Sequence, residues 1–133
     1  MNFLIDTNIC IYIMNKRPPE VIQKFKTMEV GQIAISSITV SELQYGVSES
    51  KYREENLKRL DEFLTPFQIL PYDEHASKFY GEIRSHLENQ GTIIGPLDLL
   101  IAAHALSQNL ILVTNNGKEF NRIPSLKVEN WIN

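Results

Sequence analysis

The chain has 133 residues, the size of one ordinary domain, and its 43% hydrophobic and 22% charged residues exclude an intrinsically disordered protein. Its apolar runs are too short to span a bilayer and its start lacks the basic region of a signal peptide, so we expect one cytoplasmic domain over residues 1–133 with no membrane contact. Thirteen Lys and Arg against sixteen Asp and Glu give a net charge of −3, so only local patches or metal ions can attract nucleic acid.

The sequence predicts short strands that alternate with helices. The strands are continuous apolar runs, typical of parallel strands covered on both faces. Apolar residues at helical spacing, bounded by proline or glycine, predict the helices. In chain order the predicted elements are strand 3–5, a helix beginning at 18–19, strand 33–35, a helix over 57–64, strand 67–70, helix 73–91, a buried helix over 97–107, strand 110–113 and an edge strand over 127–131.

This alternation predicts a three-layer α/β/α domain with a mostly parallel sheet of four to five strands. Sheets of this kind bind ligands beyond the carboxyl ends of their strands. Asp6 and Asn8 follow the first strand, Glu42 comes after the second, and Asp98 stands at the start of the buried helix. We therefore expect these side chains to meet at one edge of the sheet.

Each of these residues also has a structural explanation. Asp6 or Asn8 can cap a helix, and Glu42 follows Thr39 at the spacing of a capping box. In a first helical turn, the negative charge of Asp98 is favoured by roughly 0.3–1 kcal/mol. Three clustered carboxylates nevertheless repel one another, and a divalent cation removes the repulsion. Oxygen ligands without a nearby cysteine suit Mg²⁺ or Mn²⁺, and such clusters serve phosphodiester cleavage.

Four stretches in this order, FLIDTN, SSITVSELQYG, GPLDLLIAAHA and LVTNNGKEF, resemble the motifs of PIN-domain ribonucleases, specifically the VapC-type toxins of bacterial toxin–antitoxin pairs. The resemblance covers nearly the whole chain. It implies a PIN fold and a metal-dependent endoribonuclease that cleaves structured RNA, with transfer RNA, including initiator tRNA, as the expected substrate. It also implies a cognate VapB-type antitoxin and a homodimer within a larger toxin–antitoxin assembly.

The resemblance assigns the principal metal to three acids and a supporting role to two polar residues, by position Asp6, Glu42 and Asp98, and Asn8 and Thr114. At the fourth acidic position family members often carry aspartate, whereas this chain has Asn116, and the nearest carboxylate is Glu119. An amide oxygen can coordinate a hard cation but contributes no charge. We therefore expect one firmly held ion and a second site that depends on Asn116, Glu119 and substrate phosphate.

Three other functions stay open at this point. A phosphatase of the haloacid-dehalogenase type would use Asp6 as its nucleophile, but Asn8 replaces the usual second acid of its D-x-D pattern. A phosphate-receiver module needs an acceptor aspartate at the end of a central strand, where Ser36 stands. The third alternative is a PIN fold that binds partners and has lost activity through the amide of Asn116.

Further residues have no assigned role in catalysis. Cys10 lies among isoleucines, which predicts a buried hydrophobic side chain. We predict that the side chains of the three histidines, His75, His86 and His104, are solvated or support other residues. One group of apolar residues predicts either core or an exposed groove for an antitoxin segment or a second copy of the chain: Leu43, Tyr45, Val47, Tyr52 and the helix around Leu57.

Overall fold

The computed structural model describes residues 1–132 of the chain. The strands of this part are β1 (Phe3–Ile5), β2 (Ile33–Ser36), β3 (Gln68–Leu70), β4 (Ile111–Val113) and β5 (Val128–Glu129). Its helices are α1 (Thr7–Asn15), α2 (Pro19–Lys26), α3 (Ser37–Ser48), α4 (Arg53–Leu64), α5 (Glu74–Asn89), α6 (Pro96–Ser107) and α7 (Gly117–Phe120), with a 3-10 turn at Val30–Gln32.

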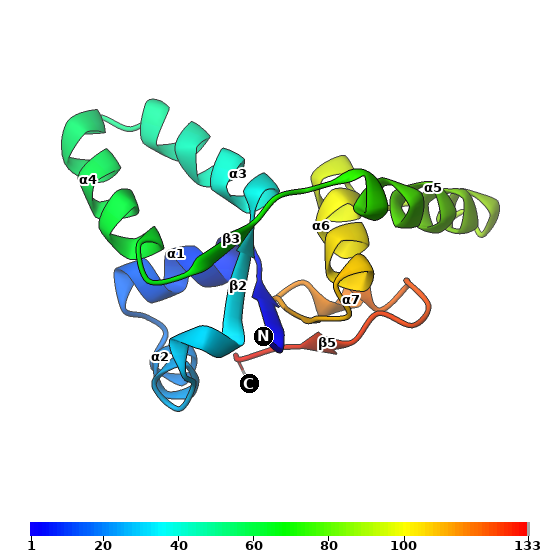
Figure 1. The fold of residues 1–133 in the computed structure, drawn as a ribbon, viewed down its shortest axis with the longest axis horizontal. Coiled ribbons are helices and arrows are strands. Elements are labelled where there is room, and N and C mark those ends of the chain that lie inside the picture. The colour runs from blue at the N-terminus through cyan, green and yellow to red at the C-terminus, as the bar shows by residue number, and fades with distance from the viewer. Residues whose placement is uncertain (133) are drawn as a thin grey trace.

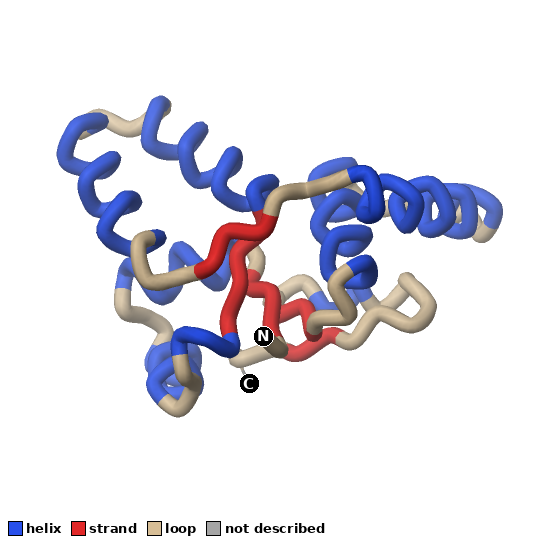
Figure 2. Tube along the Cα trace, in the orientation of Figure 1, coloured by secondary structure: helices blue, strands red, loops and turns tan. Residues whose placement is uncertain are grey.

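The strands form one parallel sheet in the order β3-β2-β1-β4-β5. β1 is central, with Leu4 opposite Ala34 of β2 on one side and Leu112 of β4 on the other. Parallel pairing requires crossover connections, and helices cover both faces of the sheet (Figures 1 and 2). The predicted α/β/α architecture is confirmed, and the edge strand β5 is shorter than the predicted 127–131.

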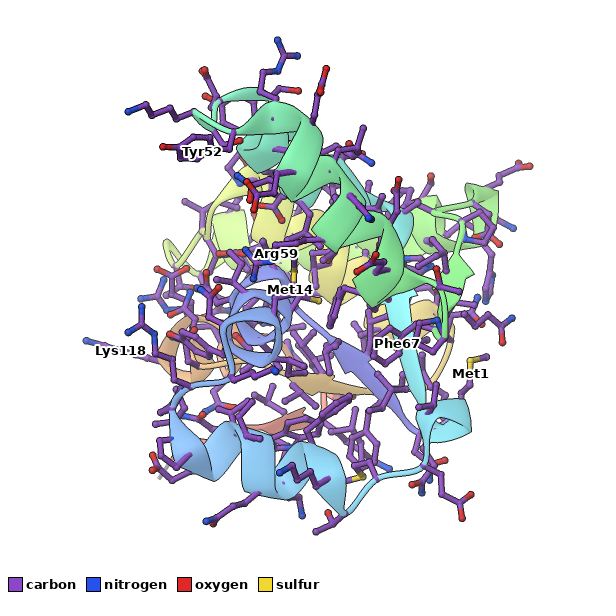
Figure 3. The ribbon with its side chains drawn as sticks, turned by 90° about the vertical axis from the view of Figure 1, so that its left-hand side faces the viewer. Met1, Met14, Tyr52, Arg59, Phe67 and Lys118 are labelled. Atoms are coloured by element: carbon purple, nitrogen blue, oxygen red, sulfur yellow. The ribbon has the colours of Figure 1, made fainter. Side chains whose placement is uncertain are left out.

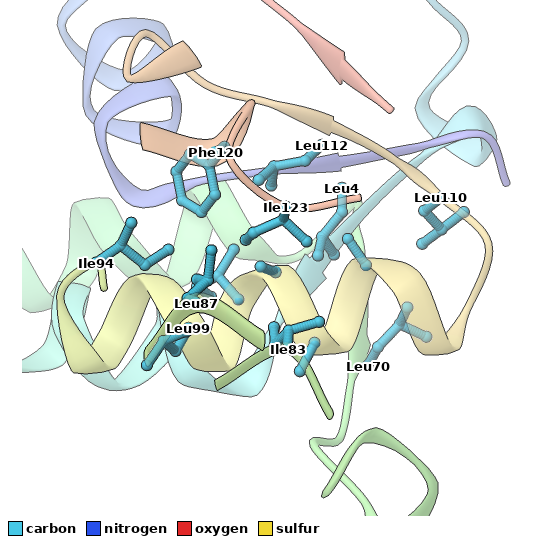
Figure 4. Packing of buried hydrophobic residues seen from close by; sticks show 14 of the residues in the cluster. Leu4, Leu70, Ile83, Leu87, Ile94, Leu99, Leu110, Leu112, Phe120 and Ile123 are labelled. Atoms are coloured by element: carbon cyan, nitrogen blue, oxygen red, sulfur yellow. The ribbon is translucent and has the colours of Figure 1, made fainter. Parts of the chain in front are cut away.

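Successive strand residues point into two hydrophobic cores, one on each face of the sheet. Leu4 and Leu112 face α5 and α6, where they pack with Ile83, Leu87, Leu99 and Phe120 (Figure 4). Ile5 and Val113 face the other helices, where they pack with Ile9, Cys10, Val21, Leu43 and Leu60. The alternation of a strand explains why neighbouring residues of β1 belong to different cores.

Polar side chains at two strand ends start the following helices. Asp6 caps α1, since its Oδ1 accepts a backbone N–H at 3.0 Å, and Ser36 caps α3, since its Oγ accepts one at 3.1 Å. Because α3 begins at Ser37, Thr39 lies inside its first turn. The predicted capping box of Thr39 and Glu42 is therefore wrong.

The predicted helix over 73–91 is confirmed as α5, with Asp73 as its N-cap. Gly91 follows the helix with a φ of +67°, a conformation that costs other residues more than glycine. The helix expected over 57–64 begins earlier, at Arg53. Its first turn carries charged residues rather than apolar ones, so the spacing of apolar residues does not mark this start. Among residues 1–132, no helix is both long and apolar enough to cross a membrane.

Candidate active site at the carboxyl edge of the sheet

Asp6 stands at the centre of the candidate site, directly after the central strand β1, and is 9% exposed. Burial raises the pKa of its carboxyl, while hydrogen bonds from the Thr114 side chain and from backbone N–H groups lower it. The nearby charge of Glu42 raises the pKa further. Asp6 is therefore a buried carboxyl group with a second acid within electrostatic range.

Glu42 reaches this edge from the second turn of α3. The hydroxyl of Thr7, the first residue of α1, donates a hydrogen bond to Glu42 Oε1 at 2.7 Å. This bond ties α3 to α1 and holds the Glu42 carboxylate close to Asp6. Sequence reasoning missed Thr7, although the residue lies in the stretch FLIDTN, because its partner is 35 positions away.

Asp98 enters the site from the first turn of α6 and is half-buried. Burial raises the pKa of its carboxyl to about 6, together with the charges of Glu119, Asp6 and Glu42. Four carboxyl groups from separate parts of the chain thus influence one another. We call Asp6, Glu42, Asp98 and Glu119 the acidic cluster, and the fold brings together all four acids that the sequence singled out.

Comparison with known proteins identifies the family. Residues 3–126 match the family model described as the PIN domain. The chain is 49% identical over 132 residues to ribonuclease VapC2 of Rickettsia felis, with 98% of each chain covered. The chain belongs to the VapC group of the PIN-domain family. It is also 41% identical over 131 residues to the tRNA(fMet)-specific endonuclease VapC of Shigella flexneri, again with 98% of each chain covered.

Solved structures agree with this membership. This chain matches a chain in the structure of VapBC2 from Rickettsia felis bound to a promoter DNA fragment, with a TM-score of 0.91 and 48% identity. The match covers 98% of this chain and 99% of that one. DNA-bound VapBC from Salmonella typhimurium matches with a TM-score of 0.92 and 40% identity, with 98% of each chain covered. Membership removes the phosphatase and phosphate-receiver alternatives, since both belong to other folds.

The acidic cluster of this PIN domain offers oxygen ligands alone. Within residues 1–132, no three Asp, Glu, His or Cys side chains already converge as closely as a bound ion requires, so the carboxylates would have to turn inward. The raised pKa of Asp98 shows that the acids share a site where negative charge is disfavoured. A hard divalent cation offsets such charge, and the donor type of the cluster fits Mg²⁺ or Mn²⁺.

Thr114 and Asn116 line the cluster at the end of β4. Thr114 is fully buried beside Asp6, and its Oγ1 accepts the backbone N–H of Asn116 at 3.0 Å. This bond brings the backbone of Asn116 close to the site. None of the hydrogen bonds of the described residues joins the Asn116 side chain to the acids.

The backbone and the side chain of Asn8 make different contacts around the acidic cluster. The backbone N–H of Asn8 is one of the groups that stabilise the charged form of Asp6. Its exposed side chain donates to Asn115 Oδ1 at 3.4 Å, and Asn115 Nδ2 donates to the hydroxyl of Tyr12 at 2.7 Å. This chain of bonds joins α1 to the loop after β4. The sequence gives no sign of these contacts, because the partners of Asn115 are more than 100 positions away.

An apolar groove of about 380 Å³ opens beside Glu42, between α1, α3 and α4. We call it the α1/α4 groove, and its lining is Ile11, Met14, Asn15, Glu42, Leu43, Gly46, Val47, Asn56, Arg59 and Leu60. Arg59 of α4 closes it over α1, where its guanidinium donates to the Met14 carbonyl at 3.3 Å (Figure 3). Leu43 and Val47 line the groove as expected, whereas Tyr45 and Tyr52 are exposed outside it.

The histidines divide into two kinds. His75 and His86 are exposed on α5, as predicted. His104 is fully buried, and its Nδ1 lies 2.7 Å from the hydroxyl oxygen of Ser36. Of the two predicted alternatives, a solvated side chain is excluded for His104, because α6 is enclosed by α5, α3 and the sheet, and a supporting side chain stays a prediction.

Proposed function

We propose that this protein is a divalent-metal-dependent endoribonuclease that cleaves structured RNA and is inhibited by a cognate antitoxin. The observation that carries the proposal is the acidic cluster, in which burial and three neighbouring carboxylates raise the pKa of Asp98 to about 6. Repulsion among these carboxylates disfavours their negative charge, and binding of a cation relieves this repulsion. The two relatives, a ribonuclease and a tRNA(fMet)-specific endonuclease, support RNA, and transfer RNA in particular, as the substrate.

Asp6, Glu42 and Asp98 are the residues that would hold the principal Mg²⁺ or Mn²⁺. Such an ion supplies an activated water and stabilises the charge that develops on the phosphodiester. Thr7 and Thr114 orient two of the carboxylates through their hydroxyl groups. Glu119 of α7 and Asn116, the residue before this helix, would bind a second ion together with substrate phosphate.

The direct test is cleavage of total bacterial RNA and of purified tRNAs, tRNA(fMet) included, by protein freed of its antitoxin. We expect discrete fragments with 5′-phosphate and 3′-hydroxyl ends in Mg²⁺ or Mn²⁺, and none in EDTA or with Asp98→Ala. Asp61→Ala is the matched control, because Asp61 is exposed on α4. Cleavage that continues in EDTA, or fragments ending in a 2′,3′-cyclic phosphate, would contradict a metal-dependent mechanism. No cleavage by folded protein would favour the inactive binding module.

The antitoxin is the proposed occupant of the α1/α4 groove. The matched structures from Rickettsia felis and Salmonella typhimurium are VapBC complexes, which supports a VapB-type partner here. An apolar groove that ends at Glu42 suits a protein segment that covers the acidic cluster while it binds. Occupation of this groove would inhibit the enzyme by blocking access of RNA to the acids.

Gly46 allows this assignment to be tested, because a Cβ added there meets no atom within 4 Å. Gly46→Phe should fill the groove without unfolding α3 and weaken antitoxin binding by at least about 10-fold, since a hot-spot contact is worth 1.4 kcal/mol or more. Isothermal titration with the antitoxin measures the change, and RNA cleavage should persist in its presence. Gly81→Phe, on α5 with equally open surroundings, is the matched control. Unchanged affinity would place the antitoxin elsewhere.

A further inference from the structure

A buried polar contact joins α6 to the start of α3. His104 Nδ1 and Ser36 Oγ lie 2.7 Å apart, both residues are fully buried, and 68 positions separate them in the chain. Buried polar groups are usually hydrogen-bonded, because burying an unpaired one costs free energy of folding. The contact is therefore a specific link between two helices that the sequence does not place together.

The Ser36 hydroxyl takes part in two hydrogen bonds at once. Ser36 is both the last residue of β2 and the N-cap of α3, and its Oγ accepts the backbone N–H of Ile38 at 3.1 Å. The Ser36 hydroxyl can still donate to Nδ1 of His104, and in that arrangement the ring proton is on Nε2. Burial lowers the pKa of His104, which favours this neutral imidazole.

The loop between β3 and α5 closes over the other side of the ring. Tyr72 packs edge-on against His104, with ring centroids 5.5 Å apart, and the Tyr72 backbone N–H donates to Ser37 Oγ at 3.0 Å. The same loop thus contacts the first residue of α3 and the imidazole of α6. His104 is held from α3, from this loop and by its own helix.

Stability alone does not account for a histidine at this position. Among the described residues, the buried His104 Nε2 has no hydrogen bond of good geometry, although the backbone carbonyl of Pro71 lies close enough to raise the pKa of the ring. An apolar side chain of similar size would avoid that cost, because replacing a buried polar group and its partner by apolar groups is often neutral or stabilising. The imidazole is the costlier choice for the core, and its direct contact is with the residue that starts α3.

Each of the two helices joined by this contact carries an acid of the cluster six residues away. Glu42 follows Ser36 by six residues on α3, and Asp98 precedes His104 by six residues on α6. Six residues correspond to about 9 Å along a helix, so each carboxylate lies about two turns from the contact along its own helix. The charge of Glu42 raises the pKa of Asp98, so the two carboxylates lie within electrostatic range of each other.

We propose that His104 is a positioning residue that, through its hydrogen bond to Ser36, sets the separation of Glu42 and Asp98 for binding a divalent cation. The inference rests on the proposed function, in which these two acids hold the ion. Without the bond, α3 loses its tether to α6 and the two carboxylates no longer keep a fixed separation. His104 itself touches neither substrate nor ion.

The test is Mn²⁺ affinity, measured by the electron paramagnetic resonance signal of free Mn²⁺ in the absence of RNA. His104→Leu should raise the Kd at least about 10-fold, the scale seen when groups that orient metal ligands are removed. His104→Asn, which keeps a hydrogen-bonding group near the position of Nδ1, should stay within about threefold of the wild type. His86→Leu on the exposed face of α5 is the control and should change nothing.

Ser36→Ala provides the second route to the same answer. It should raise the Kd by at least a similar factor, and the double variant with His104→Leu should be no worse than Ser36→Ala alone, because both changes remove the same bond between the helices. Ser36→Ala also removes the N-cap of α3, so it should in addition cost about 1 kcal/mol of stability. In RNA cleavage, kcat should fall while KM stays constant. A lower urea midpoint with unchanged Mn²⁺ affinity in folded His104→Leu and Ser36→Ala would overturn the positioning role and leave a packing role.

Failure of the proposed function is recognised separately, from the wild type. If wild-type protein binds no Mn²⁺, or binds it equally well after Asp98→Asn, the acidic cluster is not a metal site and both proposals fall. If the wild type binds Mn²⁺ and cleaves RNA while the His104 and Ser36 variants match it, only the positioning role is overturned.

Discussion

Asp6→Asn should reduce RNA cleavage by at least about 100-fold and leave the free energy of unfolding unchanged or slightly higher. Asparagine keeps a side-chain oxygen, so the cap on the Ile9 N–H is retained. The variant removes one negative charge from the acidic cluster, where burial and Glu42 already raise the pKa of Asp6. Initial rates in saturating Mn²⁺ and urea unfolding in EDTA measure the two effects.

Asp6→Ala serves as the comparison for this variant. It removes both the metal ligand and the cap, so it should lose activity to the same extent and also lose about 1 kcal/mol of stability. Asp73→Asn, which alters the N-cap of α5 on the other side of the sheet, is the matched control and should keep full activity. Near-normal cleavage by Asp6→Asn would show that Asp6 only caps α1.

Asp98→Asn should stabilise the metal-free protein at pH 8 by about 1–2 kcal/mol and have little effect at pH 4. The pKa of Asp98 rises from 3.8 to about 6 on folding, so the folded protein binds the proton more tightly than the unfolded chain. This contribution to stability is complete below pH 4 and is lost as the pH rises through 6. The full shift corresponds to about 3 kcal/mol, and we reduce it because the half-exposed carboxylate is screened by water.

Urea unfolding in EDTA from pH 4 to pH 8 measures this effect, with Asp61→Asn as the control for loss of an exposed carboxylate. Addition of Mn²⁺ at pH 8 should reverse the order, because the wild type gains stability from binding an ion that the variant holds weakly. A variant that is equally destabilised at both pH values would show that Asp98 is not under electrostatic strain. The cation would then have no repulsion to relieve.

The sheet could be predicted because its signal is local. Each strand is a short apolar run bounded by polar residues, so β1 and β4 were located within a residue of their observed ends. α1 is harder to predict, because Ile9, Cys10, Ile11 and Ile13 leave no clear apolar stripe. Only the structure shows that Ile11 differs from the other three and is exposed in the α1/α4 groove. The polar residues Asp6 and Asn8 indicate the start of α1, and the structure selects Asp6 as the cap.

The acids of the site could also be predicted, since parallel strands bring their carboxyl ends together. The polar residues that hold them could not, because the partners of Thr7 and His104 lie 35 and 68 positions away. A threonine or histidine has many uses, and only the packing of α3 against α1 and α6 selects one. Thr39 illustrates the opposite error, in which a suitable spacing from Glu42 suggested a cap that the true start of α3 excludes.

The central place of β1 has a consequence for the time at which activity can arise during synthesis. The ribosome delivers Asp6 and Glu42 early, but Asp98, β4 and Glu119 come from the last third of the chain. Until β4 pairs with β1, one edge of β1 is unpaired and the acidic cluster is incomplete. Sheets built from such distant segments form late in folding. A nascent or prematurely terminated chain therefore lacks the complete acidic cluster, and the proposed cleavage of RNA would begin only after β4 and α7 have joined the fold.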